Sequence, residues 1–234
     1  MNNKQNLVRK QFDNLAKDYK KIKQRNQTYI NELKNIFCSI VKPDSRVLEI
    51  GCGTADILAC THPKNGVGID ISPSMISIAK SGYPEYDFYC GSIENFDSEK
   101  IKLKFDYILI PDVIEYFSDF DQAFLKIKNF CRPSTKIIIT SANALWVPAL
   151  VIAEKLNLKM QDSYRKWPSN KKIMNILERN GFVIEKCSTR LLIPKNNLLF
   201  KSVNKNFHKI PLLRKCGLIM VFVAGIRNKH KLYK

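Results

Sequence analysis

The chain has 234 residues, of which 45% are hydrophobic and 10% aromatic, a composition that excludes a disordered protein and allows one full hydrophobic core. Seven scattered cysteines with no C-x-x-C pair, and only three histidines, predict reduced thiols and neither a disulfide framework nor a metal site. The formal charge of +18 is large for this length.

The first predicted elements are helices within residues 1–45. Apolar residues recur there at spacings of three and four, in two groups: Phe12, Leu15, Tyr19, Ile22, and then Ile30, Leu33, Phe37. We expect residues 1–45 to form a helical cap and residues 46–234 to form the main domain. The polar, basic start lacks the apolar segment of a secretory signal, and the longest purely apolar run, 218–226, is too short to span a bilayer. We therefore expect a cytoplasmic protein.

Strand-like runs alternate with helical patterns through the middle of the chain. The runs are RVLEI, GVGIDI, YDFYC, FDYILI and KIIIT, and each leads into a polar or amphipathic stretch. This alternation predicts an α/β fold in which a parallel, Rossmann-like sheet carries helices on both faces.

The pattern changes after Ser141. The segments ALWVPALVIAEKLNLKM and KKIMNILERNG predict helices, and the second should end at Gly181. The segments FVIEKCSTRLLI and LIMVFVAGI predict two closing strands that form an antiparallel hairpin, with a basic insertion at about 195–216 between them. From Lys195 to Lys234 there are ten Lys or Arg and no acidic residue. This charge favours phosphate on anionic lipid or nucleic acid, although a lysine-rich proteome is an alternative explanation.

The sharpest motif is the turn Gly51-Cys52-Gly53 between a strand and a helix. We expect it to present unpaired backbone N–H groups and bare glycine surface at the carboxyl edge of the sheet, where nucleotide-like ligands bind. Asp70 follows nineteen residues after Gly51, at the end of the next strand, where a carboxylate can accept both ribose hydroxyls.

Two acidic residues separate the cofactor classes that use such a turn. The dinucleotide fingerprint requires Gly or Ala where Asp56 stands, so NAD is disfavoured. Glu49 places a carboxylate at the strand tip, which suits a cofactor with an amino group and a sulfonium cation better than one with two phosphates.

The sequence E-I-G-C-G-T-A, followed by G-I-D-I-S-P-S-M-I-S-I-A-K, resembles class I S-adenosylmethionine (SAM)-dependent methyltransferases over residues 8–141. The resemblance implies that SAM is the cofactor and that the glycine turn lies against its methionine part. It also implies the following roles: Glu49 supports the methionine part, Asp70 accepts the ribose hydroxyls, Ile71 packs on the adenine, Ser92 and Ile93 border the adenine, and Asp112 lies beside the transferable methyl.

The sequence departs from this family at two turns. Ala55 stands where a third glycine is common, which is tolerable if its φ is negative and otherwise costs about 1 to 2 kcal/mol. Arg132-Pro133-Ser134-Thr135 replaces the usual proline-glycine turn before the fifth strand, remote from the cofactor.

Methyl transfer depends mainly on alignment of the reactants, so no single side chain is diagnostic of catalysis. Tyr116, where many relatives have a histidine, and Asp112 are the catalytic candidates, and Tyr19 from the leading helices could cover the cofactor. Ordinary alternatives exist for most of these residues: aromatic packing for Tyr19 and Tyr116, helix capping for Asp70 and Asp112, a lysine pair for Glu49, and a small filler role for Cys52.

The acceptor is only indirectly indicated. The signature of nucleobase amino methylation is missing after the fourth strand, which reads Ile110-Pro111-Asp112-Val113, so nucleic acid is disfavoured. Segments of the second half, including Trp167-Pro168-Ser169 and LLIPK, resemble methyltransferases associated with bacterial glycosyltransferases and surface polysaccharide assembly. That resemblance implies a small-molecule, saccharide or lipid-linked acceptor methylated on oxygen, a glycosyltransferase partner, and peripheral contact of the basic region with an anionic membrane, at the inner membrane face. An RNA methyltransferase and a non-catalytic Rossmann-like binding domain are the alternatives.

Overall fold

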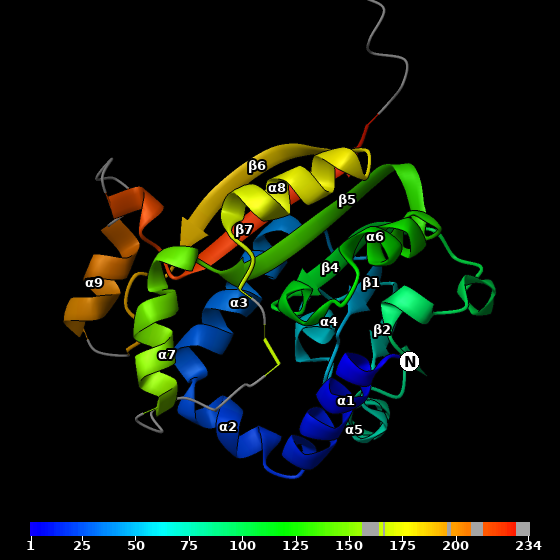
Figure 1. Ribbon diagram of the computed structural model, residues 1–234, viewed down its shortest axis with the longest axis horizontal. Helices are drawn as coiled ribbons and strands as arrows, with labels where there is room; N and C mark the ends of the chain where they lie inside the picture. Colours follow the sequence, from blue (N-terminus) through cyan, green and yellow to red (C-terminus); the bar gives the residue numbers. More distant parts are fainter. Residues whose placement is uncertain (156–163, 166, 196–197, 207–212, 228–234) are drawn as a thin grey trace, which may run out of the picture.

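The computed structural model describes residues 1–155, 164–165, 167–195, 198–206 and 213–227, which form a seven-stranded mixed sheet with helices around it (Figure 1). The strands are β1 (Arg46–Ile50), β2 (Asn65–Asp70), β3 (Asp87–Cys90), β4 (Phe105–Pro111), β5 (Cys131–Ala142), β6 (Phe182–Arg190) and β7 (Ile219–Ile226). The α-helices are α1 (Asn3–Ala16), α2 (Tyr19–Arg25), α3 (Gln27–Ile40), α4 (Asp56–Cys60), α5 (Pro73–Gly82), α6 (Phe120–Lys128), α7 (Val147–Lys155), α8 (Asn170–Arg179) and α9 (Leu198–Asn206). Short 3₁₀ turns are η1 (Ile93–Asn95), η2 (Ser98–Lys100), η3 (Ile114–Tyr116), η4 (Ala144–Trp146) and η6 (Leu213–Lys215).

The sheet confirms the predicted fold class. Strands β1 to β5 are parallel, β7 pairs antiparallel with both β5 and β6, and the order is β3-β2-β1-β4-β5-β7-β6. β6 ends at Arg190, three residues before the predicted end, because Leu191 has a φ of +54° and cannot continue a strand. The chain order reverses between β1 and β4, which is where doubly wound sheets bind their ligands.

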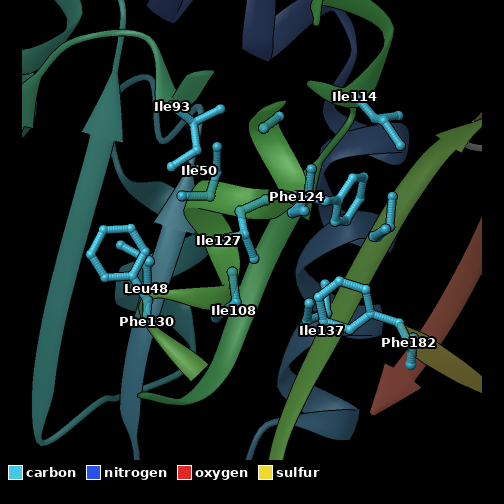
Figure 2. Close-up of a cluster of buried hydrophobic side chains, with 14 of the residues drawn as sticks. Leu48, Ile50, Ile93, Ile108, Ile114, Phe124, Ile127, Phe130, Ile137 and Phe182 are labelled. Carbon is cyan, nitrogen blue, oxygen red and sulfur yellow. The ribbon is translucent and has the colours of Figure 1, made fainter. Parts of the chain in front are cut away.

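The central strands contribute side chains to two hydrophobic layers, one on each face of the sheet, because successive side chains of a strand point to opposite faces. Leu48 and Ile50 of β1 pack on the side covered by α6 and α8, together with Phe124 and Phe182 (Figure 2). Val47 points to the opposite side, which is covered by α3, α4 and α5. The alternation also fixes Glu49 on the α3–α5 side.

The leading helices lie against the main sheet structure. α3 packs through Leu33, Ile36 and Phe37 into the layer under β1 and β4. α1 is held at the start of α5, because Ser72 Oγ and the Ser74 backbone N–H donate to the Asp13 carboxylate at 2.6 and 3.2 Å. The predicted helices are therefore present, while the division into a cap, 1–45, and a main domain, 46–234, stays a prediction.

The C-terminal half is described in part. α8 ends as predicted before Gly181, whose φ is +76°. Of the basic insertion at about 195–216, residues 196–197 and 207–212 lie outside the described residues, as does the predicted continuation of the α7 helix beyond Lys155. Within the described ranges, no helix combines the length and apolar character needed to cross a bilayer.

Two cysteines meet at the surface between α3 and α4. All seven cysteines are free thiols, and Cys38 Sγ lies 2.8 Å from Cys60 Sγ. We expect oxidised glutathione to take one hydrogen from each thiol, giving a Cys38–Cys60 disulfide and two glutathione thiols. A disulfide between these two residues, which are 22 positions apart in the chain, should raise the melting temperature of the protein by about 5 to 10 °C.

Mass spectrometry and thermal unfolding measure this expectation. Cys38→Ser should abolish both the cross-link and the shift in melting temperature, whereas Cys187→Ser, which removes another exposed thiol, should change neither. A wild-type protein that gains glutathione on Cys38 without the internal cross-link would contradict it.

Candidate functional site

A cavity of about 470 Å³ lies at the carboxyl ends of β1, β2 and β4, beneath α1, α2 and α3. Every residue that the sequence predicts for the site lines this one cavity: Tyr19, Glu49, Gly51, Cys52, Gly53, Asp70, Ile71, Ser92, Ile93, Asp112 and Tyr116. The fold therefore brings them together from the ends of β1 and β2, the segments after β1 to β4, and the leading helix α2. Their individual roles stay predictions.

The glycine turn differs from its predicted form in one respect. Its backbone N–H groups are not unpaired: those of Gly51 and Cys52 donate to the Ile69 carbonyl at 2.7 and 3.1 Å, and that of Gly53 donates to Asp70 Oδ2 at 2.8 Å. The turn folds back on the end of β2, so these N–H groups are already hydrogen-bonded within the protein. It offers a ligand carbon surface and a neighbouring carboxylate, which suits a cation better than a phosphate.

The two glycines are required for different reasons, although both have positive φ, +69° at Gly51 and +52° at Gly53. A Cβ at Gly51 would lie 2.4 Å from Cγ2 of Val113, so the segment after β4 packs directly on this position. A Cβ at Gly53 would meet only the Tyr19 ring, 3.7 Å from its Oη. Gly53 thus supplies the open surface of the turn, and Tyr19 faces it.

Asp70 ends β2 with its carboxylate at the cavity. Its oxygens accept hydrogen bonds from the Gly53 and Ser72 backbone N–H groups at 2.8 and 2.9 Å. Enclosure by the protein raises the pKa of Asp70 to about 6 despite these bonds. Asp70 is not the cap of α5, because Ser72 occupies the N-cap position and accepts from Met75.

Glu49 is almost completely buried and accepts a hydrogen bond from the Leu58 backbone N–H at 2.8 Å. Burial raises its pKa well above the ordinary value for a glutamate. The lysine of this region, Lys23, pairs with Asp56 instead. Two carboxyl groups, Glu49 and Asp70, therefore line the cavity near the glycine turn.

Helix α2 covers the glycine turn. Lys23 donates to Thr54 Oγ1 and to the Asp56 carboxylate, and its ammonium lies 4.8 Å from the centroid of the Tyr19 ring. Asp56, the residue that disfavours NAD, thus anchors the helix that carries Tyr19.

Ala55 has a positive φ of +61° and is completely buried. We expect Ala55→Gly to change the free energy of unfolding by less than about 0.5 kcal/mol, because relief of the left-handed conformation offsets the loss of one buried methyl group. Ala59→Gly, within the helix α4 that Ala55 precedes as N-cap, should lower it by about 1 kcal/mol. Urea unfolding measures both, and equal losses would show that Ala55 is not strained.

Asp112 directly follows β4 and lines the same cavity. Its backbone has a φ of +53°, and its carboxylate accepts from Tyr29 Oη at 2.6 Å and from Thr140 Oγ1 at 2.7 Å. Burial and the neighbouring Asp112 raise the pKa of Tyr29 well above its usual value, so the phenol stays a donor. Asp112 does not cap the following helix, because Asp119 is the N-cap of α6. A strained residue with an oriented carboxylate at a cavity is typical of functional sites.

Tyr116 belongs to an ion-pair cluster at the cavity. Its hydroxyl accepts from Arg165 Nη2 at 2.9 Å, and Arg165 Nε lies 3.0 Å from Glu115 Oε2. Burial raises the pKa of Glu115 to about 7, although Arg165 opposes the shift. The Tyr116 ring also packs edge-on against Phe12 of α1, with centroids 5.3 Å apart. The aromatic packing named as an alternative is thus present, while a catalytic role stays a prediction.

Sequence reasoning missed several residues that shape the cavity. Gln5 of α1 donates to Ser92 Oγ at 3.2 Å and to the Glu94 carboxylate, whose other oxygen accepts from Ser118 N–H at 2.6 Å. These partners are far apart in the chain, and no local pattern links them. Glu115 did carry a signal, because a carboxylate inside the apolar run VIEYF needs a partner.

The comparisons with known proteins agree with this geometry. Residues 41–181 match a family described as a methyltransferase domain. A protein of Invertebrate iridescent virus 6 that is named as a methyltransferase is 30% identical over 106 residues, which is 44% of this chain and 39% of that protein. Carboxy-S-adenosyl-L-methionine synthase 1 of Yersinia pseudotuberculosis is 25% identical over 167 residues, 65% of this chain and 62% of the synthase. The chain thus spans less than two thirds of the length of these two relatives.

A solved structure shares the fold at low identity. Magnesium protoporphyrin IX methyltransferase of Synechocystis PCC 6803, solved with SAH bound, superposes with a TM-score of 0.67 at 15% identity and covers 97% of this chain and 100% of that one.

The described residues hold no group of three or more His, Cys, Asp or Glu side chains placed for a metal ion.

Proposed function

Because the chain belongs to the family of methyltransferase domains, we propose that it transfers the methyl group of SAM to a hydroxyl oxygen of a small-molecule, saccharide or lipid-linked acceptor. The observation that carries the proposal is that one cavity contains both the glycine turn, with the Asp70 carboxylate beside it, and the Asp112–Tyr29 pair. One end suits a cationic nucleoside, and the other places a carboxylate where an acceptor hydroxyl could reach it.

The residues at the first end fit SAM. The N–H donors of the turn are already paired within the protein, so the turn does not attract a pyrophosphate, while the Asp70 carboxylate favours a ligand with positive charge. Asp70 would hold the ribose, Gly53 would lie along the methionine part, and Tyr19 would cover it. Bound SAM supplies a methyl group on a sulfonium, which is an electrophile for a nucleophilic oxygen.

The residues at the second end suit proton removal from a hydroxyl. The Asp112 carboxylate would accept the proton, and Tyr29 and Thr140 fix its orientation. Apolar side chains, among them Leu33, Leu150 and Leu218, line part of the same cavity. Alignment can lower the barrier by about 7 to 11 kcal/mol, and a base adds on the order of 10² to 10⁴ in rate.

The acceptor class rests on the apolar wall and on the sequence resemblance to enzymes of polysaccharide assembly. A polynucleotide would bring its phosphates toward the carboxylates of Asp70 and Asp112, which repel them. A glycosyltransferase partner follows from the same resemblance and is part of the proposal.

Transfer of labelled methyl from SAM into fractionated lipid, saccharide and RNA extracts tests the function. We expect label in an alkali-stable ether on a lipid-linked or saccharide acceptor, and none with Asp70→Asn. Label confined to RNA would overturn the acceptor class. Tight SAM binding without any transfer would favour the non-catalytic alternative.

A further inference from the structure

Helix α7 and the preceding turn η4 expose an apolar ridge, defined here as Leu145, Pro148, Ala149, Val151 and Ile152. Leu145 is 67% exposed, Ile152 57% and Val151 36%, and Pro148 and Ala149 are also exposed. Of the eight large hydrophobic side chains exposed in the described part of the chain, three lie within these eight consecutive positions. Such a concentration marks an interaction surface rather than scattered exposure.

The opposite side of this segment is fixed against the protein. Trp146 Nε1 donates to the Cys216 carbonyl at 2.7 Å, and Leu150 lines the cavity. Asn143, just before η4, donates through its side-chain amide to the Lys215 and Gly217 carbonyls at 2.9 and 2.8 Å. The ridge therefore faces outward because the inner positions of the same segment are occupied.

The same hydrogen bonds bring positive charge to the segment that carries the ridge. They attach η6 to the start of α7, and η6 carries the exposed side chains of Arg214 and Lys215. The sequence contains no acidic residue after Glu185. In Figure 1, α7 runs from the ends of β6 and β7 toward the lower edge of the molecule, and α9 is drawn farther out. An exposed aliphatic ridge flanked by cations is the composition of a segment that lies in the membrane interface.

We propose that the ridge and η6 bind the surface of an anionic phospholipid bilayer. The aliphatic side chains enter the headgroup region, and Arg214 and Lys215 pair with lipid phosphates. A nucleic acid would leave Leu145, Val151 and Ile152 in water. A second copy would bring together two chains that each carry a formal charge of +18.

The surface also bears on the proposed acceptor. Leu150 belongs to the same helix as the ridge and lines the cavity, so a lipid-linked acceptor would reach the cavity along this helix. This last step rests on the proposed function, whereas the binding surface itself does not.

Sedimentation with phosphatidylcholine vesicles, with and without phosphatidylglycerol, tests the surface. The wild-type chain should bind the anionic vesicles only. Leu145→Ser/Val151→Ser/Ile152→Ser should weaken this binding at least about tenfold. Arg214→Gln/Lys215→Gln should also weaken it about tenfold and reduce its dependence on salt.

Two controls keep the result interpretable. Leu125→Ser removes a side chain of α6 that is 57% exposed, as Ile152 is, and should leave vesicle binding unchanged. The melting temperature of the ridge variant should be unchanged, which excludes misfolding as the cause of lost vesicle binding. Its SAM affinity should also be unchanged, which separates the test of the surface from the test of the proposed function. Unaltered binding of the ridge variant would overturn the proposal. Wild-type dimerisation that the ridge substitutions abolish would also overturn it, in favour of a second copy.

Discussion

Asp70→Asn is expected to weaken SAM binding on the order of 100-fold, the largest effect of any single substitution at the cofactor end. The carboxylate stands at the end of β2, and two backbone N–H groups hold it in place. Hydrogen bonds to a charged acceptor contribute about 1.5 to 3 kcal/mol, and an amide keeps one acceptor oxygen only. Isothermal titration of the purified protein with SAM measures the loss.

The raised pKa of Asp70 makes the same interaction dependent on pH. SAM favours the ionised carboxylate, whose pKa in the unliganded protein is about 6. Affinity should therefore be constant above that value and fall by about tenfold for each pH unit below it. Asp70→Asn should remove this dependence.

A matched substitution separates the site effect from a general loss of charge. Asp87→Asn alters an exposed aspartate on the neighbouring strand β3 and should leave both the affinity and its pH dependence unchanged. Full affinity in Asp70→Asn would mean that the ribose is held elsewhere, and the assignment of the glycine turn would fail with it.

Asp112→Asn is expected to lower kcat by about 10² to 10⁴ while leaving SAM affinity within about threefold of the wild-type value. The reason is that an amide preserves the contact with Thr140 but cannot take the acceptor proton. Single-turnover methyl transfer to the acceptor identified by labelling measures kcat. An undiminished rate would exclude Asp112 as the base and leave alignment alone as the source of catalysis.

Tyr29→Phe distinguishes a positioning role from simple packing. The phenol donates to Asp112 Oδ2 at 2.6 Å and so holds the carboxylate that is proposed to take the acceptor proton. Without this bond the carboxylate loses its orientation, so kcat for methyl transfer should fall by about tenfold, while KM for SAM should stay within about threefold of the wild-type value. An undiminished kcat would indicate that Tyr29 acts only by packing.

Local sequence predicted the helices and strands and a cofactor site at the glycine turn. The strands and the turn at 51–53 follow from patterns within a few residues of each other, because strand periodicity and positive φ at glycine are local properties. The order of the elements placed Asp70 at the same sheet edge as the turn, since parallel strands end at a common edge. The rest of the cofactor assignment came through a family resemblance that depends on the same local motif.

The residues at the proposed acceptor end are brought together only by the tertiary structure. Tyr29 meets Asp112 across 83 residues, and Arg165 meets Tyr116 across 49. Such pairs depend on how helices pack on the sheet, and no periodicity encodes which side chains then touch. Even in the glycine turn, the fate of the backbone N–H groups depended on the neighbouring strand β2, because its Ile69 carbonyl accepts two of them. The sequence by itself predicted a cationic nucleoside at this edge. Only packing decided which groups line the proposed acceptor end, because they come from distant segments and are joined by contact alone.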